Sequence, residues 1–130
     1  MKNKLDLDTF IRERLAEVNE ARNFNAWVKA EGWRNLYVRL TRRSLPTGFY
    51  DSVLDLASLE VRKPGTGTFT RLIERLRRDY PNLTIYVENV WNQRFQRKLV
   101  SLGFAPVDWP HQLLEDTRCY VLGAVQRVNE

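Results

Sequence analysis

Residues 52–70 read SVLDLASLEVRKPGTGTFT, and this stretch decides the fold because a glycine-rich turn joins a strand to a helix in it. Residues 52–61 place apolar side chains on both alternating faces, which is typical of a central strand covered on both sides. Residues 68–79 carry apolar side chains at steps of three and four, the spacing of an amphipathic helix. The order strand, turn, helix predicts the first half of a parallel strand–helix–strand unit.

The chain after this stretch supplies the second half of the unit. Residues 83–88 are rich in β-formers and predict the parallel partner strand. Residues 91–102 have the apolar spacing of another helix, which Gly103 should end. Two short final strands are expected, at 104–107 and 119–122, with 109–117 connecting them. The whole chain is therefore predicted to be α/β with a mixed sheet.

The region before residue 52 predicts helices followed by a strand. Two N-terminal helices are expected within about residues 6–31, the first over 6–22 with Asp8 as its N-cap. Residues 35–43 alternate between apolar and polar side chains, so they predict a half-buried strand. The sequence SLPTG at 44–48 then predicts a turn.

Length and composition indicate one folded domain, taken as 1–130. The 130 residues are 43% hydrophobic and 12% aromatic, which is enough for a core. One cysteine and one histidine cannot make the usual four-ligand zinc site or an internal disulfide, so no metal is expected. The absence of a long apolar run and of a hydrophobic signal core argues against a membrane and favours a cytoplasmic location.

Positive charge is concentrated in the second half of the chain. The net charge is +5, yet the segment 62–98 alone carries nine bases and three acids. Its excess of +6 would attract an anionic ligand, such as a phosphorylated cofactor or a nucleic acid. A solvated, arginine-rich helix face is the alternative interpretation.

The turn before the predicted helix has the chemistry of a phosphate site. A loop that opens a helix exposes backbone N–H groups without intrahelical acceptors, and the positive helix end also favours an anion. Gly65 and Gly67 allow close approach, while Thr66 and Thr68 add hydroxyl groups. The loop matches neither the P-loop nor the dinucleotide fingerprint, so a plain tight turn remains the alternative.

These residues resemble the GNAT superfamily of acyl-CoA N-acyltransferases over about residues 52–122. The sequence Arg62-Lys63-Pro64-Gly65-Thr66-Gly67 matches the family's Arg/Gln-x-x-Gly-x-Gly/Ala signature between a central strand and a helix. A helix-opening asparagine with Gly-Phe eleven and twelve residues later is a second feature of the family. Asn92 with Gly103 and Phe104 has that spacing.

The resemblance implies a splayed mixed sheet flanked by helices on both faces, with a CoA-binding core at about 52–104. Acetyl-CoA would lie in a V-shaped gap between residues 53–61 and 83–88. Arg97 or Lys98 would reach its 3′-phosphate. The residues implied to bind acetyl-CoA are Leu59, Val61, Arg62, Lys63, Gly65, Thr66, Gly67, Thr68 and Asn92.

The implied reaction is transfer of an acetyl group to an amine acceptor, and it needs a base for the amine proton. Glu60 and Glu88 are the candidates because each ends a strand beside the implied cofactor. Either could instead lie in solvent, or pair with Arg62 or Arg39. Asp55, in mid-strand, is expected to be structural and to need a partner if buried.

Two other functions remain open at this point. Many family members carry a tyrosine seven residues after the asparagine, where it protonates the leaving thiolate, but this chain has Leu99. A catalytically inactive protein that binds CoA or a protein partner is therefore the alternative. Nucleic-acid binding is unlikely, because the arginine stripe at residues 71, 75 and 78 lacks interleaved aromatic residues. A homodimer would cover an open sheet edge. Trp33, Trp91 and Trp109 either line an acceptor pocket or belong to the core.

Overall fold

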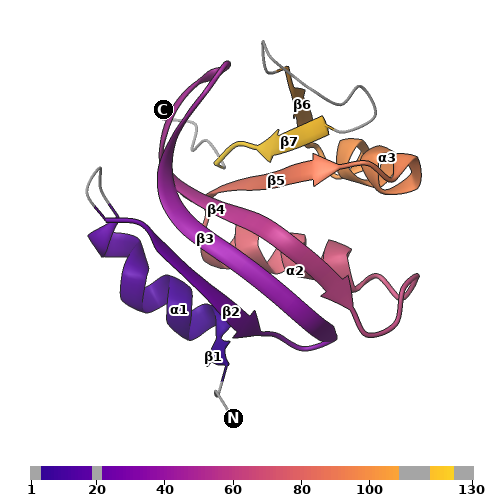
Figure 1. The fold of residues 1–130 in the computed structure, drawn as a ribbon, viewed down its shortest axis with the longest axis horizontal. Coiled ribbons are helices and arrows are strands. Elements are labelled where there is room, and N and C mark those ends of the chain that lie inside the picture. The colour runs from indigo at the N-terminus through magenta and orange to yellow at the C-terminus, as the bar shows by residue number, and fades with distance from the viewer. Residues whose placement is uncertain (1–3, 19–21, 109–117, 125–130) are drawn as a thin grey trace.

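The computed structural model describes residues 4–18, 22–108 and 118–124, which form a mixed α/β structure with one seven-stranded sheet and three α-helices (Figure 1). The N-terminal elements are β1 (Leu5–Asp6), α1 (Leu7–Arg14), a 3-10 turn (Leu15–Glu17), β2 (Phe24–Lys29) and β3 (Trp33–Leu45). The later elements are β4 (Gly48–Val61), α2 (Thr68–Asp79), β5 (Thr84–Val90), α3 (Gln93–Ser101), β6 (Ala105–Val107) and β7 (Arg118–Leu122).

The sheet has the order β1-β2-β3-β4-β5-β7-β6. β4 and β5 pair in parallel and α2 connects them, so the predicted strand–helix–strand unit is confirmed. α2 also has the predicted bounds of 68–79. β5, α3, β6 and β7 lie within two residues of their predicted ends, while the predicted connection 109–117 lies outside the described residues.

The apolar pattern of β4 has a different cause from the one its sequence indicated. Leu54 pairs with Leu40 and Leu56 with Val38, but the register then shifts, and Leu59 pairs with Leu36. A β-bulge inserts one extra residue into a strand, so side chains on either side of it lose their strict alternation. Leu54, Leu56 and Leu59 therefore face the same way, although the sequence placed Leu59 on the opposite face.

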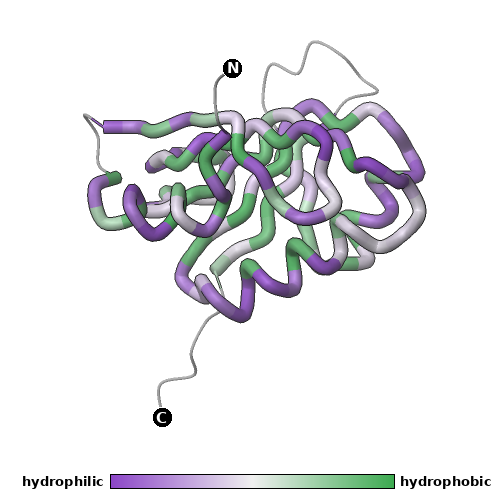
Figure 2. Tube along the Cα trace, turned by 90° about the horizontal axis from the view of Figure 1, so that it is seen from below, coloured by the Kyte–Doolittle hydropathy of each residue, from purple (hydrophilic) through white to green (hydrophobic). Residues whose placement is uncertain are grey.

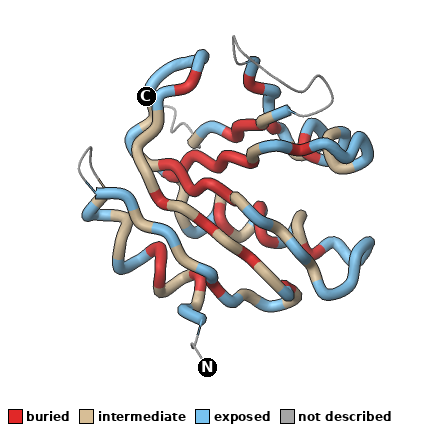
Figure 3. Tube along the Cα trace, viewed as in Figure 1, coloured by how far each residue is buried: buried red, intermediate tan, exposed pale blue. Residues whose placement is uncertain are grey.

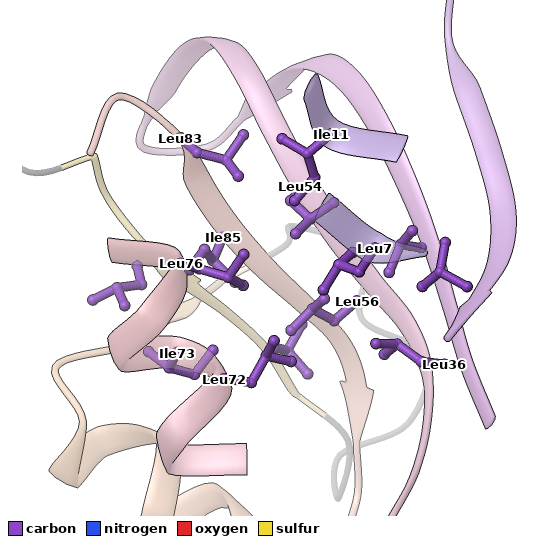
Figure 4. Packing of buried hydrophobic residues seen from close by; sticks show 14 of the residues in the cluster. Leu7, Ile11, Leu36, Leu54, Leu56, Leu72, Ile73, Leu76, Leu83 and Ile85 are labelled. Atoms are coloured by element: carbon purple, nitrogen blue, oxygen red, sulfur yellow. The ribbon is translucent and has the colours of Figure 1, made fainter. Parts of the chain in front are cut away.

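One large core lies on this face of the sheet, between the strands and the helices (Figure 4). α1 contributes Ile11 beside Leu54 and Leu7 beside Leu56, and α2 contributes Leu76 beside Ile85. Leu99 of α3 is fully buried in the same cluster. The expectation of helices on both faces is therefore wrong for the described residues. Apolar residues recur between hydrophilic ones along these helices (Figure 2), as expected of helices that pack on one side only.

The opposite face has a smaller core, confined to one end of the sheet. It comprises Leu45, Val53, Tyr86, Val107 and Val121. The β3–β4 hairpin bends toward β6 at this end (Figure 1), which lets the hairpin residue Leu45 join residues of β5, β6 and β7. The rest of this face, on β3 and β4, is crossed by no helix of the described chain.

The N-terminal region departs furthest from its prediction. The second helix expected before residue 31 is instead the strand β2, with Phe24, Ala26 and Val28 paired to alternate residues of β3. Their spacing of two is the period of a strand, and Trp27, which broke the pattern, is half exposed on the other face. The first helix ends at Arg14 and not near residue 22. The 44–48 turn is confirmed as a hairpin between Leu45 and Gly48.

The N-cap of α1 is Asp6, and not Asp8 as the sequence indicated. Asp6 Oδ2 accepts hydrogen bonds from the backbone N–H groups of Asp8 and Thr9, at 3.1 and 3.3 Å. Asp8 instead accepts from Arg75 at 2.7 Å and from the Tyr80 hydroxyl at 3.1 Å, which ties α1 to α2.

We expect Asp6→Ala to lower the free energy of unfolding by about 1 kcal/mol, because two helix N–H groups lose their acceptor. Urea denaturation measures the change. Glu13→Ala is the control, since Glu13 is exposed on the same helix, and it should change stability by less than about 0.5 kcal/mol. An equal effect of the two substitutions would contradict the capping role of Asp6.

Candidate functional site

The parallel strands β4 and β5 separate before either of them ends. Their pairing runs from Val53 with Thr84 to Leu56 with Val87. β4 continues to Val61 and β5 to Val90 without pairing to each other. Residues of β4 are buried from Val53 to Leu56, and from Ala57 onward they are half-buried or exposed. This end of β4 thus has an open edge, with backbone groups available to a ligand.

Two irregularities accompany this separation. The β3–β4 register shifts between Tyr37 and Val38, as described above, and the β5–β7 register shifts between Val87 and Val90. Asn89, inside the second shift, has a φ of 55°, a left-handed conformation that asparagine tolerates better than most residues. Bulges bend a strand and increase its twist, so they direct β4 and β5 apart beyond the pair Leu56–Val87.

The loop of residues 62–67 follows the open end of β4 and is exposed throughout (Figure 3). Gly65 and Gly67 have φ values of 81° and 79°, in the left-handed region that favours glycine. The Thr66 hydroxyl donates to the Lys63 carbonyl at 2.7 Å. Arg71 donates to the Thr66 carbonyl, also at 2.7 Å. Side chains thus brace the loop from within and fix how it enters α2.

A cleft of about 670 Å³ lies between this loop, the open end of β4 and α3. Seven of the nine residues implied to bind acetyl-CoA line it, namely Leu59, Val61, Lys63, Gly65, Gly67, Thr68 and Asn92. They come from a strand, a loop and two helices, so the fold brings together positions that are up to 33 residues apart in sequence. Arg94 and Lys98 of α3 add positive charge to the same cleft.

The asparagine of the second sequence feature has a structural role in α3. Asn92 is the N-cap, and its Oδ1 accepts from the Phe95 N–H at 3.1 Å. Gly103 ends the helix with a φ of 99°. The N–H of the next residue, Phe104, donates a hydrogen bond to the Leu99 carbonyl at 3.0 Å. The spacing from Asn92 to Phe104 is thus the length of a capped helix with a buried aromatic residue at its end. Leu99 itself is in the core, as its sequence position indicated.

Aromatic side chains form the wall of the cleft beside these helices. The Phe69 and Phe95 rings meet edge to face with centroids 5.0 Å apart, and Trp33 lies 6.4 Å from Phe69. Trp33 is 5% exposed, which confirms the core interpretation for this residue. Trp91 is 72% exposed, and it is not among the residues that line the cleft. Trp109 lies outside the described residues.

A second, basic groove of about 720 Å³ lies on the other side of the loop, toward the β2–β3 turn. This groove is lined by the two remaining residues implied to bind acetyl-CoA, Arg62 and Thr66, and by Arg71 and Arg75 of α2. Arg75 is already paired with Asp8, which reduces the positive charge that the arginine stripe offers to an external anion. Of the two bases implied for a 3′-phosphate, Lys98 lines the first cleft. Arg97 lines a separate shallow depression.

The two candidate bases have different surroundings. Glu60 is exposed, and its Oε1 accepts from Asn35 Nδ2 at 2.5 Å, so neither arginine considered from the sequence is its partner. Glu88 is half-buried and pairs with Arg39 at 2.8 Å, which confirms the predicted partner. Glu88 follows Val87 directly, at the point where β4 and β5 separate.

The sequence did not indicate that Asp55 belongs to the same group as Glu88. Its side chain is fully buried, and its Oδ2 lies 3.3 Å from both Arg39 Nη1 and Arg43 Nη1. The pKa of Asp55 is raised to about 6, first by burial and then by the charge of Glu88, with the two arginines opposing the rise. The available signal was an acid in an apolar strand, next to a strand that carries two arginines four residues apart, and therefore on one face.

No family model matches this chain, and no curated protein matches it. The described residues form no group of three or more His, Cys, Asp or Glu side chains that could hold a metal ion. Within the same residues, none of the helices has the length and apolar character needed to cross a membrane.

Proposed function

We propose that this protein is a GNAT-type N-acetyltransferase, which transfers the acetyl group of acetyl-CoA to an amine. The observation that carries the proposal is the single cleft lined by both sequence features. The glycine loop of the first feature and the helix opened by Asn92 are independent in sequence, yet Lys63, Gly65, Gly67 and Asn92 border the same cavity beside an unpaired strand edge, while Arg62 lies in the basic groove on the other side of the loop. A cavity of this volume falls in the range of small-molecule sites.

Each part of the cleft suits a different part of acetyl-CoA. The open edge of β4 offers backbone donors and acceptors to the two amides of the pantetheine arm. The loop from Lys63 to Thr68 precedes α2, whose first N–H groups and positive end favour the pyrophosphate. Lys63, Arg94 and Lys98 line the cleft and contribute charge. From Val61 back to Leu56 the strand rises about 17 Å, so an extended arm would reach the point where β4 and β5 separate.

A second function is favoured by one observation and competes with the first. Leu99 stands where many family members carry the tyrosine acid, and it is fully buried in the core. A protein that binds CoA or a partner without transferring an acetyl group would have no need of that acid. In its CoA-binding form the second function shares the cofactor cleft with the first and differs from it only in turnover.

Titration calorimetry with acetyl-CoA, followed by an assay of free CoA thiol with a panel of primary amines, tests both functions. We expect binding in the micromolar range and release of thiol that depends on the amine. Binding without thiol release for any amine would support the second function. No heat and no thermal shift at millimolar acetyl-CoA would rule out the transferase and the CoA-binding form of the second function.

A further inference from the structure

The geometry points to Glu88 as the group that takes the proton of the acceptor amine, on the sheet face opposite the helices, with Arg39 and the buried Asp55 as its positioning residues. This inference rests on the proposed acetyl transfer. It assigns the acceptor side of the reaction, whereas the cleft described above assigns the cofactor side.

Glu88 directly follows the last β5 residue that pairs with β4, at the point where the two strands separate. The last β4–β5 pair is Leu56 with Val87, and Val87 faces the large core together with the helices. Successive strand residues alternate between faces, so Glu88 lies on the other face, as its contacts with Arg39 and Arg43 also show. Glu88 does not line the cleft itself, but an acetyl group delivered along the open edge of β4 as far as the Leu56–Val87 pair would be one β5 residue away from Glu88.

Four charged side chains form a network around this point. Arg39 Nη1 donates to Glu88 Oε1 at 2.8 Å and to Asp55 Oδ2 at 3.3 Å, so one nitrogen bridges both carboxylates. Arg43 donates to Asp55 Oδ2 at 3.3 Å, and its Nη2 lies 3.9 Å from Glu88 Oε2. The Arg43 guanidinium also stacks over the Tyr86 ring, 4.4 Å from its centroid. The groups that face Asp55 are therefore two cations from β3 and Glu88 and Tyr86 from β5.

The second carboxylate oxygen of Asp55 distinguishes this network from an ordinary ion pair on the surface. Asp55 is fully buried, and among the described residues its Oδ1 has no hydrogen-bond partner. Burying a carboxylate with one oxygen unpaired is costly, so hydrophobic packing alone does not explain an aspartate at this position. Asp55 has a geometric effect on Glu88, because both carboxylates accept from the same Arg39 nitrogen and Asp55 therefore helps to fix the guanidinium that holds Glu88 in place.

Acetyl transfer begins with removal of a proton from the acceptor. The Glu88 carboxylate takes one proton from the acceptor ammonium, and the freed nitrogen lone pair forms a C–N bond with the thioester carbonyl carbon. Collapse of the tetrahedral adduct breaks the C–S bond, and the thiolate takes the second amine proton. Glu88 returns its proton to water. The products are the amide, CoA thiol and one proton, and the side chains end in their starting state.

Glu88→Gln tests the proton acceptor. We expect kcat to fall about 100-fold, as for loss of a general base, while the acetyl-CoA Kd stays within about twofold. Asp51→Asn is the matched control, because Asp51 is an acid of β4 that is 85% exposed and pairs only with Arg42 among the described residues. Unchanged kcat in Glu88→Gln would overturn the inference while leaving the proposed function intact. If wild type transfers no acetyl group, the proposed function itself fails.

Asp55→Asn tests the positioning role through the pH profile of kcat. Wild-type activity should fall as the pH drops through about 6, where Asp55 gains a proton and no longer holds the Arg39 guanidinium as an anion. Asp55→Asn lacks that anion and its titration at every pH. The rate at pH 8 should therefore fall about tenfold, and the acid limb should move to lower pH. A purely structural role would lower activity without moving the limb, and an unmoved limb would overturn the inference for Asp55.

Discussion

Replacing Gly65 by aspartate is expected to abolish acetyl-CoA binding and to leave the protein folded. A Cβ at this position would meet no heavy atom within 4 Å, so the new side chain has room. The residue would keep a φ near 81°, which costs about 1 kcal/mol for most residues and less for Asp and Asn. A carboxylate about 4 Å from a phosphate would oppose binding by about 4 kcal/mol, or roughly 1000-fold in Kd.

Gly65→Asn is the matched control for this substitution. Asparagine has the same shape as aspartate and tolerates the same left-handed backbone, but it carries no charge. We expect it to retain acetyl-CoA affinity within about tenfold, and both variants to unfold within about 1 kcal/mol of wild type. Gly67 is less suitable, because a Cβ there would lie 3.1 Å from the Arg71 guanidinium, which braces the loop. If Gly65→Asp binds acetyl-CoA as well as Gly65→Asn does, the loop does not hold the phosphates.

The elements predicted most accurately from the sequence are those whose apolar residues follow one regular spacing from end to end. α2 has apolar residues at helical spacing, a glycine turn before it and a proline after it, and its bounds were predicted correctly. β2 was mistaken for a helix because Trp27, half exposed on the outer face, interrupts an otherwise alternating run. An exposed tryptophan next to a buried valine looks the same in sequence as two residues of a helical stripe. Only the pairing of this segment with β3 shows that it is a strand and not a helix.

The faces of the sheet were not predictable for a related reason. Leu54, Leu56 and Leu59 cannot share a face in a regular strand, so their spacing indicated burial on both sides. The β3–β4 bulge makes them share one. Since a bulge depends on how two strands are matched, a single strand's sequence does not reveal it. The same limit applies to the site: the residues along the cleft follow from local motifs, whereas the Asp55 network depends on alignment across β3, β4 and β5.

The largest effect on stability is expected from Asp55→Asn at neutral and alkaline pH. The pKa of Asp55 is raised from 3.8 to about 6 by burial and by the charge of Glu88. An acid whose pKa is raised by folding binds more protons in the folded state, so its ionisation destabilises the fold as the pH increases. A shift of about 2 pKa units corresponds to about 3 kcal/mol. Asparagine removes the charge while keeping the shape of the side chain.

The unfolding free energy of Asp55→Asn should therefore exceed that of wild type by about 3 kcal/mol at pH 8. The difference should shrink as the pH falls below about 6 and vanish well below 3.8, where Asp55 is uncharged in both the folded and the unfolded state. Urea denaturation across this range measures it, and Asp51→Asn, at an exposed position of the same strand, should show no such trend. A variant that is less stable than wild type at pH 8 would mean that Arg39 and Arg43 more than offset the burial of Asp55. A variant that is more stable but slower would identify Asp55 as a residue retained for catalysis at the expense of stability.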